Sequence, residues 1–345
     1  MTAPKLSTPI ISVGELPTGS EEDVSDVDLE GSGAEFELRT INVPIESHGA
    51  RLDRALVQMV SEFSRSHLQQ LIAAGAVRYA GLAVTKASSR VKAGDCFTIE
   101  LRPTLQSQAF QPEAMDLEVL FEDAYLMVIN KPAGLVVHPA PGNWSGTLLN
   151  GLLARDTQAA LLPRAGIVHR LDKDTSGLMV VARHRQTMEQ LVAMIAARTV
   201  SREYLALAHG SWQGSTTRHV DFPVGRDPRN RLKMAVVDPD KTPGKTAATD
   251  ISVLDNTSRH CAVRCRLHTG RTHQIRVHMA AIGHPLVGDA VYGGQAGGGL
   301  ERQALHAWRL VFKHPVTGLP LSFHLPPPPD LQSASAQLGL RYNLD

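Results

Sequence analysis

The sequence predicts an α+β protein made of two folded units of unequal size. The chain has 345 residues, of which 43% are hydrophobic and 20% charged, enough for two or three domains with cores of their own. Two helical patterns and a few short strands lie within residues 51–102, whereas strand-like segments dominate the remainder. Because those strands do not alternate regularly with helices, we expect the larger unit to contain a mixed, largely antiparallel sheet.

The smaller unit is predicted over residues 49–102. Apolar residues from Leu52 to Phe63 recur with helical spacing, and Ser64 stands at the N-cap of a second helix that Gly75 ends. Short strands should follow. A polar linker over residues 103–113 then leads into the larger unit.

The larger unit is predicted over residues 114–327, and residues 328–345 are expected to form a C-terminal tail. Its strand patterns include residues 117–121, 178–182 and 261–267. Helical patterns interrupt them at about residues 186–198 and 271–282. This order is typical of helices packed on one antiparallel sheet.

The near-neutral total charge conceals a strong asymmetry along the chain. The formal net charge is +1, which by itself would argue against a nucleic-acid partner. Residues 1–38 contain one basic and nine acidic residues, a net charge of −8, so the rest of the chain carries +9. We interpret the first segment as an acidic disordered tail and the rest as a basic body suited to RNA.

Several classes of protein are excluded by composition. No apolar run approaches the ~18 residues that a transmembrane helix needs, and the first residues do not resemble a secretory signal. Cys96, Cys261 and Cys265 are too few and odd in number for a disulfide framework. We therefore predict a cytoplasmic protein that is not bound to a membrane.

Ionisable residues concentrate in a loop at residues 169–177, between two apolar strands. The segment reads HRLDKDTSG, with Asp172 between cationic neighbours. One interpretation is a turn in which Asp172 or Asp174 accepts hydrogen bonds from the local backbone. The density of charge between apolar strands favours a functional site instead. A weaker signal, NKPAGLVVHP at residues 130–139, is a strand that ends in a Pro/Gly loop.

A third motif, LHTGRTHQIRVH, occupies residues 267–278. The helix after Gly270 places Arg276 close to its core-facing stripe, where a guanidinium needs a carboxylate partner. Asp172 is the expected partner. Three histidines, His268, His273 and His278, suggest a metal centre, but their spacing of five matches no helical ligand pair, so we predict none.

Together the motifs resemble the RluA/RluD family of pseudouridine synthases. The likeness extends from about Arg51 to Pro327, and it rests on HRLD with LDKDTSGLMVVA and on GRTHQIRVHMA followed by HPLVGDAVYG at residues 284–293. Residues 138–143 and 163–166 are most similar to the RluD branch. Residues 51–53 and 64–66 resemble the S4 RNA-binding domain. The resemblance implies a pseudouridine synthase fold with an N-terminal S4-like module.

The resemblance also implies a substrate and roles for individual residues. The substrate is 23S ribosomal RNA at the helix 69 stem-loop, free or in a pre-50S or 50S particle, and the enzyme acts as a monomer. Asp172 matches the catalytic aspartate, Arg276 its partner, and Tyr204 the tyrosine that stacks on the base, although a core strand tyrosine is the simpler interpretation. Substrate binding is implied for these residues: Arg170, which displaces the uridine, His169, Lys131, Arg271, Arg51 and Arg65.

No cofactor is expected, because the sequence has no Walker loop, dinucleotide fingerprint or metal motif. Basic residues at 225–245 are expected to bind phosphates, although a solvated loop would have the same composition. The aspartate is either a nucleophile at C1′ or a base at C2′. Two other functions stay open: an RNA-binding assembly protein without catalysis, or a synthase for another rRNA or tRNA site. A hydrolase is disfavoured because no nucleophile–base set is found.

Overall fold

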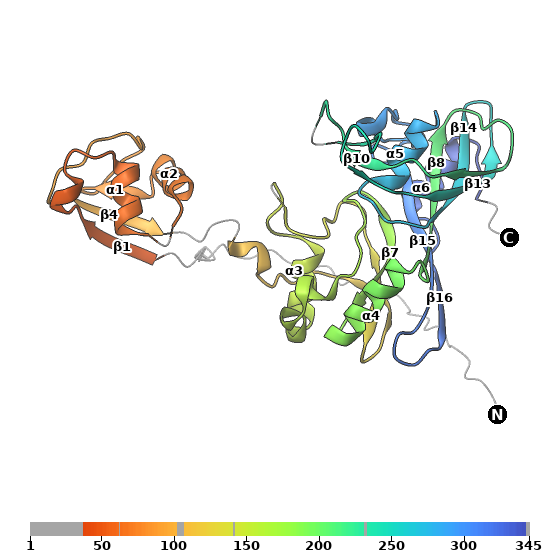
Figure 1. The fold of residues 1–345 in the computed structure, drawn as a ribbon, viewed down its shortest axis with the longest axis horizontal. Coiled ribbons are helices and arrows are strands. Elements are labelled where there is room, and N and C mark those ends of the chain that lie inside the picture. The colour runs from red at the N-terminus through yellow and green to blue at the C-terminus, as the bar shows by residue number, and fades with distance from the viewer. Residues whose placement is uncertain (1–36, 62, 102–106, 141, 231–232, 343–345) are drawn as a thin grey trace, which may run out of the picture. The chain divides into compact units, whose positions relative to one another are not determined.

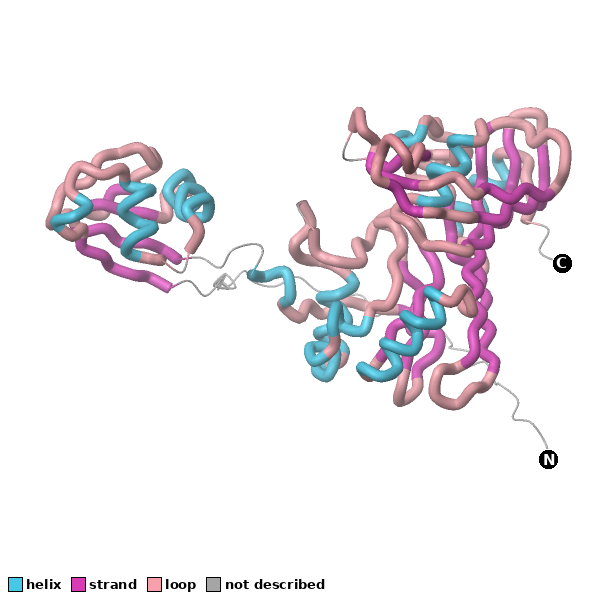
Figure 2. The backbone as a smooth tube through the Cα atoms, viewed as in Figure 1, coloured by secondary structure: helices cyan, strands magenta, loops and turns pink. Residues whose placement is uncertain are grey.

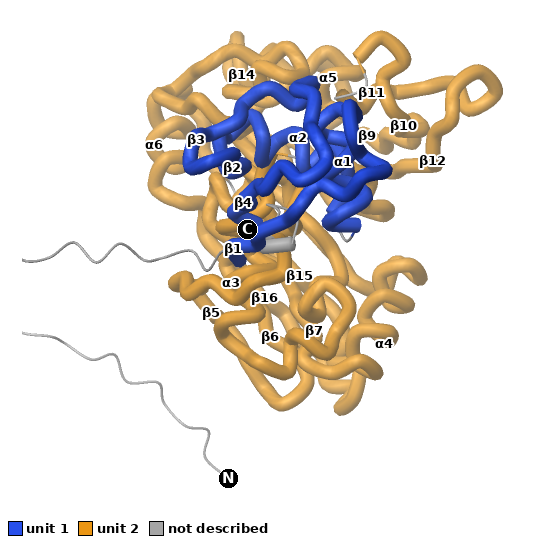
Figure 3. Tube along the Cα trace, turned by 90° about the vertical axis from the view of Figure 1, so that its left-hand side faces the viewer, with its two compact units in different colours: residues 1–102 blue, residues 103–345 orange. Residues whose placement is uncertain are grey.

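The structure, a computed structural model, describes residues 37–61, 63–101, 107–140, 142–230 and 233–342. The chain divides into two compact units, residues 1–102 and 103–345, which Figure 3 colours separately. The predicted acidic tail lies outside the described residues except for its last two positions. Part of the predicted linker, residues 103–106, also lies outside them.

The smaller unit is a four-stranded antiparallel sheet with two helices. The sheet has the order β1 (Glu37–Asn42), β4 (Cys96–Leu101), β2 (Val77–Tyr79), β3 (Leu82–Ala83), and the helices are α1 (Leu52–Met59) and α2 (Arg65–Ala73). Both helices were predicted, and the hydroxyl of Ser64 caps α2 by accepting from the backbone N–H of His67 at 3.3 Å. The predicted start at residue 49 is too late, since β1 pairs with β4 along its whole length.

The larger unit is built on a nine-stranded sheet, which is mixed and largely antiparallel as predicted. Its strands are, in spatial order, β5 (Glu118–Glu122), β6 (Leu126–Lys131), β7 (Ser176–Ala182), β15 (Leu305–Lys313), β8 (Ser201–His209), β14 (His260–Leu267), β13 (Thr249–Asn256) and β9 (Thr217–Val220), with β16 (Pro320–His324) on β15. Only β7 and β15 pair in parallel among the described strands of this sheet. This parallel pair lies in the middle of the sheet.

Short helices cover the sheet at both ends. They are α3 (Leu148–Arg155), α4 (Arg185–Ala196), α5 (Gln274–Ala281) and α6 (Pro329–Gln337), with 3₁₀ turns η1 (Ile45–Ser47) in the smaller unit and η2 (Ser107–Phe110), η3 (Thr157–Leu161), η4 (Pro163–Gly166) and η5 (Ala290–Tyr292) in the larger. Figures 1 and 2 show α3 and α4 beside β7 at one end, and α5 and α6 with β8, β13 and β14 at the other. A small sheet, β11 (Met234–Val236), β10 (Val224–Arg226), β12 (Gly244–Lys245), completes the unit.

The C-terminal boundary differs from the prediction. Residues 328–345 were expected to form a tail, but α6 lies within them and packs on the larger unit. Leu331 and Ala334 are fully buried there. The sequence hid this helix because its start is proline-rich and its buried stripe is narrow. None of the helices in the described part of the chain has the length and apolar character needed to cross a bilayer.

Candidate active site

A cleft of about 630 Å³ opens on the larger unit where the Asp172 loop (residues 169–175), β8 and the start of α5 meet. Asp172, Tyr204 and Arg276 all line it, although they are far apart in the sequence. The sheet order explains this meeting, since β15 alone separates β7, which follows the Asp172 loop, from β8. The loop of Asp172 and the helix of Arg276 thus meet at one cleft, as their expected pairing requires.

The Asp172 loop is held by backbone and side-chain hydrogen bonds on both sides. Its turn closes where the backbone N–H of Thr175 donates to the carbonyl of Asp172 at 3.1 Å. The backbone N–H of Gly134 donates to the carbonyl of Lys173 at 3.0 Å, which joins this loop to the Pro/Gly loop after β6. The backbone thus closes a turn, but among the described residues no local backbone N–H donates to the carboxylate of Asp172 or Asp174, as the alternative interpretation required. The Asp172 side chain, 14% exposed, faces the cleft instead.

Arg276 lies between two carboxylates at the floor of the cleft. Its Nε and Nη2 donate to Asp289 at 2.7 and 2.8 Å, and its Nη1 donates to Asp172 at 3.3 Å. Burial lowers the pKa of Arg276, but the hydrogen bonds and charge of Asp289, together with Asp172, raise it overall. The predicted pairing with Asp172 is confirmed, and the guanidinium stays charged although its side chain is only 6% exposed.

Asp289 and Tyr292 complete this centre, and the sequence did not single them out. The Asp289 side chain is 1% exposed and makes the two shorter bonds to Arg276. The ring centroid of Tyr292 lies 4.9 Å from Cζ of Arg276, within reach of a cation–π interaction. Its hydroxyl lies 2.7 Å from Nδ1 of His273, whose Nε2 is 3.9 Å from Asp172. The sequence feature that could have pointed to Asp289 is an aspartate within the apolar run HPLVGDAVYG.

Tyr204 lies both in the hydrophobic core and at the cleft. It is 5% exposed and belongs to the main hydrophobic core of the larger unit, yet it also lines the cleft. Burial, first, and the charge of Asp172 raise the pKa of its hydroxyl, although Arg202 opposes the shift. The phenol is therefore neutral and its ring is fixed in place.

Three of the predicted substrate-binding residues line the same cleft. Arg170 is exposed, and Arg271 is half-buried with its Nε donating to the carbonyl of Thr246 at 3.0 Å. Nε2 of His169 accepts from the backbone N–H of Val180 at 3.1 Å. Burial, reinforced by Arg202, lowers the pKa of His169 to about 3, so its imidazole is neutral.

Comparison with known proteins places this geometry in a family. Residues 125–281 match the model of RNA pseudouridylate synthases, and residues 50–95 match that of the S4 domain. The chain is 45% identical over 340 residues to the ribosomal large subunit pseudouridine synthase D of Neisseria meningitidis serogroup A, covering 94% of this chain and 89% of that protein. The chain belongs to the RNA pseudouridine synthase family.

Further relatives agree. The ribosomal large subunit pseudouridine synthase D of Nitrosomonas europaea is 45% identical over 314 residues, covering 88% of this chain and 89% of its own length. Among solved structures, human RNA pseudouridylate synthase domain containing 4 has a TM-score of 0.52 at 25% identity, over 65% of this chain and 94% of that one. The predicted RluD branch of the family is thus confirmed, as is the predicted fold.

Lys131 of this family member does not face the cleft. It is fully buried, and its Nζ donates to the carbonyls of Pro132, Leu135 and Lys173 at 2.7, 2.8 and 2.9 Å. Burial lowers its pKa to about 7, although Asp174 and Asp172 oppose the shift. This position does not agree with the predicted contact with substrate, because three backbone carbonyls surround Nζ. Lys131 instead fastens the Pro/Gly loop to the Asp172 loop.

Arg51 and Arg65 belong to the S4 domain, where both pair with Asp53. The distances are 3.0 Å from Nε of Arg51 and 2.8 Å from Nη2 of Arg65, and the Asp53 side chain has no exposed surface. These contacts, the Arg51 hydrogen bond first, lower the pKa of Asp53 in spite of its burial. The side chains of Arg51 and Arg65 remain 39% and 48% exposed, so both stay accessible from solvent.

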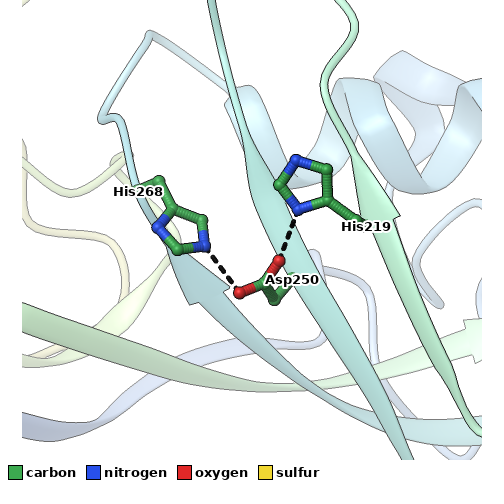
Figure 4. Close-up of side chains that lie close together, drawn as sticks. All are labelled: His219, Asp250 and His268. Carbon is green, nitrogen blue, oxygen red and sulfur yellow. Dashed lines mark hydrogen bonds and ion pairs between the residues drawn. The ribbon is translucent and has the colours of Figure 1, made fainter.

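The three histidines considered as metal ligands are not brought together. In the described part of the chain, one group of three potential ligands lies close: His219, Asp250 and His268 (Figure 4). Nδ1 of His219 and Nε2 of His268 each lie 2.5 Å from a different oxygen of Asp250. Tetrahedral zinc with bonds of ~2.0–2.1 Å separates its ligand atoms by about 3.3 Å, so these contacts fit hydrogen bonds.

Proposed function

We propose that this protein converts uridine to pseudouridine in large-subunit (23S) ribosomal RNA. The observation that carries the proposal is the convergence of Asp172, Arg276 and Tyr204 in one cleft. Both relatives described above are named as ribosomal large subunit pseudouridine synthases, which supports this class of substrate. Within that RNA, we propose the helix 69 stem-loop as the target.

The reaction requires the target uridine to leave the helix stack, because C1′ and C5 cannot be reached inside a duplex. Arg170 is exposed at the cleft and is suited to take the vacated place in the stack. The flipped base would then lie against the ring of Tyr204, since aromatic stacking is a common way to hold an unpaired base. The freed uracil is retained during its rotation by the same contact.

Bond changes balance within the nucleotide. The N1–C1′ bond breaks, the uracil rotates, and C5 bonds to C1′; C5 then loses its proton and N1 gains one. Asp172 acts either as a nucleophile at C1′ or as a base at C2′, and both need its carboxylate beside the ribose. Arg276 orients that carboxylate through the 3.3 Å hydrogen bond. Tyr204, which lines the same cleft, is proposed to take part in removing the C5 proton.

RNA outside the cleft meets cationic surface on both units. The segment 225–245 of the larger unit carries Arg226, Arg229, Lys233, Lys241 and Lys245, while Arg231 lies outside the described residues. Lys233 donates to the carbonyl of Val291 at 2.7 Å, and Lys241 pairs with Asp238 at 2.9 Å. The loop is thus partly fixed by internal contacts, and we propose that Arg229 and Lys245 bind phosphates.

The substitution Asp172→Asn tests the proposal. We expect it to abolish pseudouridine formation in a 23S transcript while affinity for the RNA is kept, because the amide has the shape of the carboxylate but lacks its nucleophilic or basic oxygen. Asp174→Asn, in the same loop, is the matched control and should keep activity. Full activity of Asp172→Asn, scored by chemical labelling of pseudouridine and primer extension, would refute the assignment.

Mapping pseudouridines in rRNA from cells with and without the gene tests the target. Loss at helix 69 supports the proposal, whereas an unchanged helix 69 would refute this target and leave the reaction type standing. Comparing free 23S rRNA, pre-50S and 50S particles as substrates identifies the form that reacts. We propose that a monomer acts, in the cytoplasm where ribosomal particles assemble, and the mass of the RNA-bound species checks the monomer.

A further inference from the structure

Arg202 is a buried cation without a partner in the cleft. It is 6% exposed, and its Nε is buried without a hydrogen-bond partner. No side-chain hydrogen bond or ion pair joins it to any residue in the described ranges. A buried guanidinium is stable only when its donors are satisfied, since an uncompensated buried charge costs several kcal/mol. Because Arg202 lines the open cleft, a molecule that binds there can supply the missing acceptor.

The carboxylate next to Arg202 is used elsewhere. Glu203 follows it on β8 and thus points to the opposite face of the sheet. There its carboxylate accepts from Nη1 of Arg309 at 2.8 Å and lies 4.0 Å from Arg264. On the neighbouring strands, the residues in register with Arg202 are the apolar Leu267 and Leu310. The strand therefore offers Arg202 no counter-charge of its own.

His169 adds a second unsatisfied donor to the same cleft. Its Nε2 accepts a hydrogen bond from the backbone of Val180, so the proton of the neutral imidazole is on Nδ1. That Nδ1 is buried and has no partner in the described part of the protein. Arg202 and His169 both line the cleft, and the charge of Arg202 adds to burial in lowering the pKa of His169. A guanidinium and an imidazole N–H thus both lack an acceptor in one cavity.

Gly270 leaves the space that the guanidinium fills. A Cβ atom at this position would lie 2.7 Å from Nη1 of Arg202, too close for the side chain to keep its place. Gly270 also lines the cleft, together with Arg202 and His169. The position of the Arg202 guanidinium therefore depends both on β8, which carries it, and on the turn before α5, which leaves room for it.

We propose that Arg202 and the Nδ1–H of His169 form an anion site that binds a backbone phosphate of the RNA at the flipped nucleotide. An uncompensated guanidinium selects an anion over the neutral carbonyls of the base, and its fork matches two phosphate oxygens. Arg202 and Tyr204 lie on the same face of β8, ~7 Å apart, so the phosphate belongs to the nucleotide whose base stacks on Tyr204 or to its neighbour. This inference rests on the proposed function.

The full-length variant Arg202→Met tests the site through two readouts that move in opposite directions. Because it removes a buried unpaired charge, we expect the melting temperature without RNA to stay the same or rise. Affinity for the target stem-loop should fall about tenfold to hundredfold, the range for a hydrogen-bonded charge pair. Affinity is measured by fluorescence anisotropy in the Asp172→Asn background, so that no turnover occurs.

Replacing single phosphates identifies the ligand. A stem-loop with one uncharged methylphosphonate at the flipped nucleotide, or at its neighbour, should bind the Arg202-containing protein more weakly by the same factor. The same replacement should leave the affinity of Arg202→Met unchanged. Arg259→Met, in the turn at the far end of β14, is the control and should lose less than about twofold. Gly270→Ala should reproduce the loss of affinity by displacing the guanidinium.

The outcomes separate the two proposals. If the wild-type protein forms pseudouridine and Arg202→Met keeps full affinity, the anion site is refuted and the proposed function stands. The site is also refuted if every methylphosphonate weakens both proteins equally, or if Arg202→Met lowers the melting temperature as it lowers affinity. If the wild-type protein forms no pseudouridine in any rRNA, the proposed function fails whatever the binding results.

Discussion

Replacing Asp289 by alanine should lower the free energy of unfolding of the larger unit by about 3–5 kcal/mol, the range for removing one partner of a buried ion pair. Asp289 accepts the two shorter hydrogen bonds of Arg276, at 2.7 and 2.8 Å, and both side chains are almost completely buried. Without it, Arg276 keeps a single bond of 3.3 Å to Asp172. The penalty is thus that of a guanidinium left half-paired away from water.

Tryptophan fluorescence during urea denaturation isolates this effect. All three tryptophans, Trp144, Trp212 and Trp308, lie in the larger unit, so their signal does not report the S4 domain. For a unit of this size, about 2–4 °C of melting temperature corresponds to 1 kcal/mol, and the expected decrease is about 6–20 °C. Pseudouridine formation should also fall at temperatures where the variant is folded, because Arg276 would no longer be fixed beside Asp172.

Asp330→Ala is the matched control for this experiment. Asp330 accepts from Nε of Arg302 at 2.7 Å, the same length as the Asp289 bond, but its side chain is 48% exposed. Although the Arg302 side chain is 14% exposed, water can replace the open Asp330 carboxylate, so the loss should be clearly smaller than for Asp289→Ala. Equal destabilisation by Asp289→Ala and Asp330→Ala would refute the argument that burial sets the cost.

Three further predictions concern titration, stacking and charge. Because the pKa of Lys131 is about 7 in the fold and 10.5 in the unfolded chain, only the unfolded chain holds this proton between those values. The contribution of Lys131 to the free energy of unfolding should therefore increase from pH 7 to 10. Urea titrations of Lys131→Met should lack this increase with pH, and the same increase in the variant would contradict the prediction. Tyr204→Phe should keep RNA affinity but lose turnover, whereas Tyr204→Ala should lose both; rapid turnover by Tyr204→Phe would exclude a role for the hydroxyl. Deleting residues 1–36, which spares β1, should raise affinity for unrelated RNA at low salt, and an unchanged affinity in filter binding would reject the acidic segment as a competitor.

The contact between Asp172 and Arg276 could be predicted because each signal was local. A guanidinium on the buried stripe of a helix needs a carboxylate, and the Asp172 loop was the charged segment closest to apolar strands. Asp289 could not be found in this way, since neither hydropathy nor spacing reports that residues 276 and 289 meet. The same limit applies to Arg202. That it lacks a carboxylate partner is visible only when the face of the sheet on which Glu203 lies is known.

The ends of both units were hidden for a different reason. β1 follows the acidic segment directly, and its apolar and polar residues alternate only weakly. It forms a strand because it pairs with β4, which its own sequence does not indicate. α6 begins at prolines that read as the end of the fold, although proline is well suited to a first helical turn. In both cases tertiary packing decides the conformation.

The unequal sharing of Arg276 has a consequence for reactivity. Two of its N–H groups bind Asp289, and one bond of 3.3 Å is left for Asp172. A carboxylate held at both oxygens by a forked guanidinium would have its lone pairs occupied and its nucleophilicity and basicity damped. Because Asp289 binds both forked donors, a single hydrogen bond orients Asp172. Its other lone pairs then stay available for the proposed reaction with the ribose.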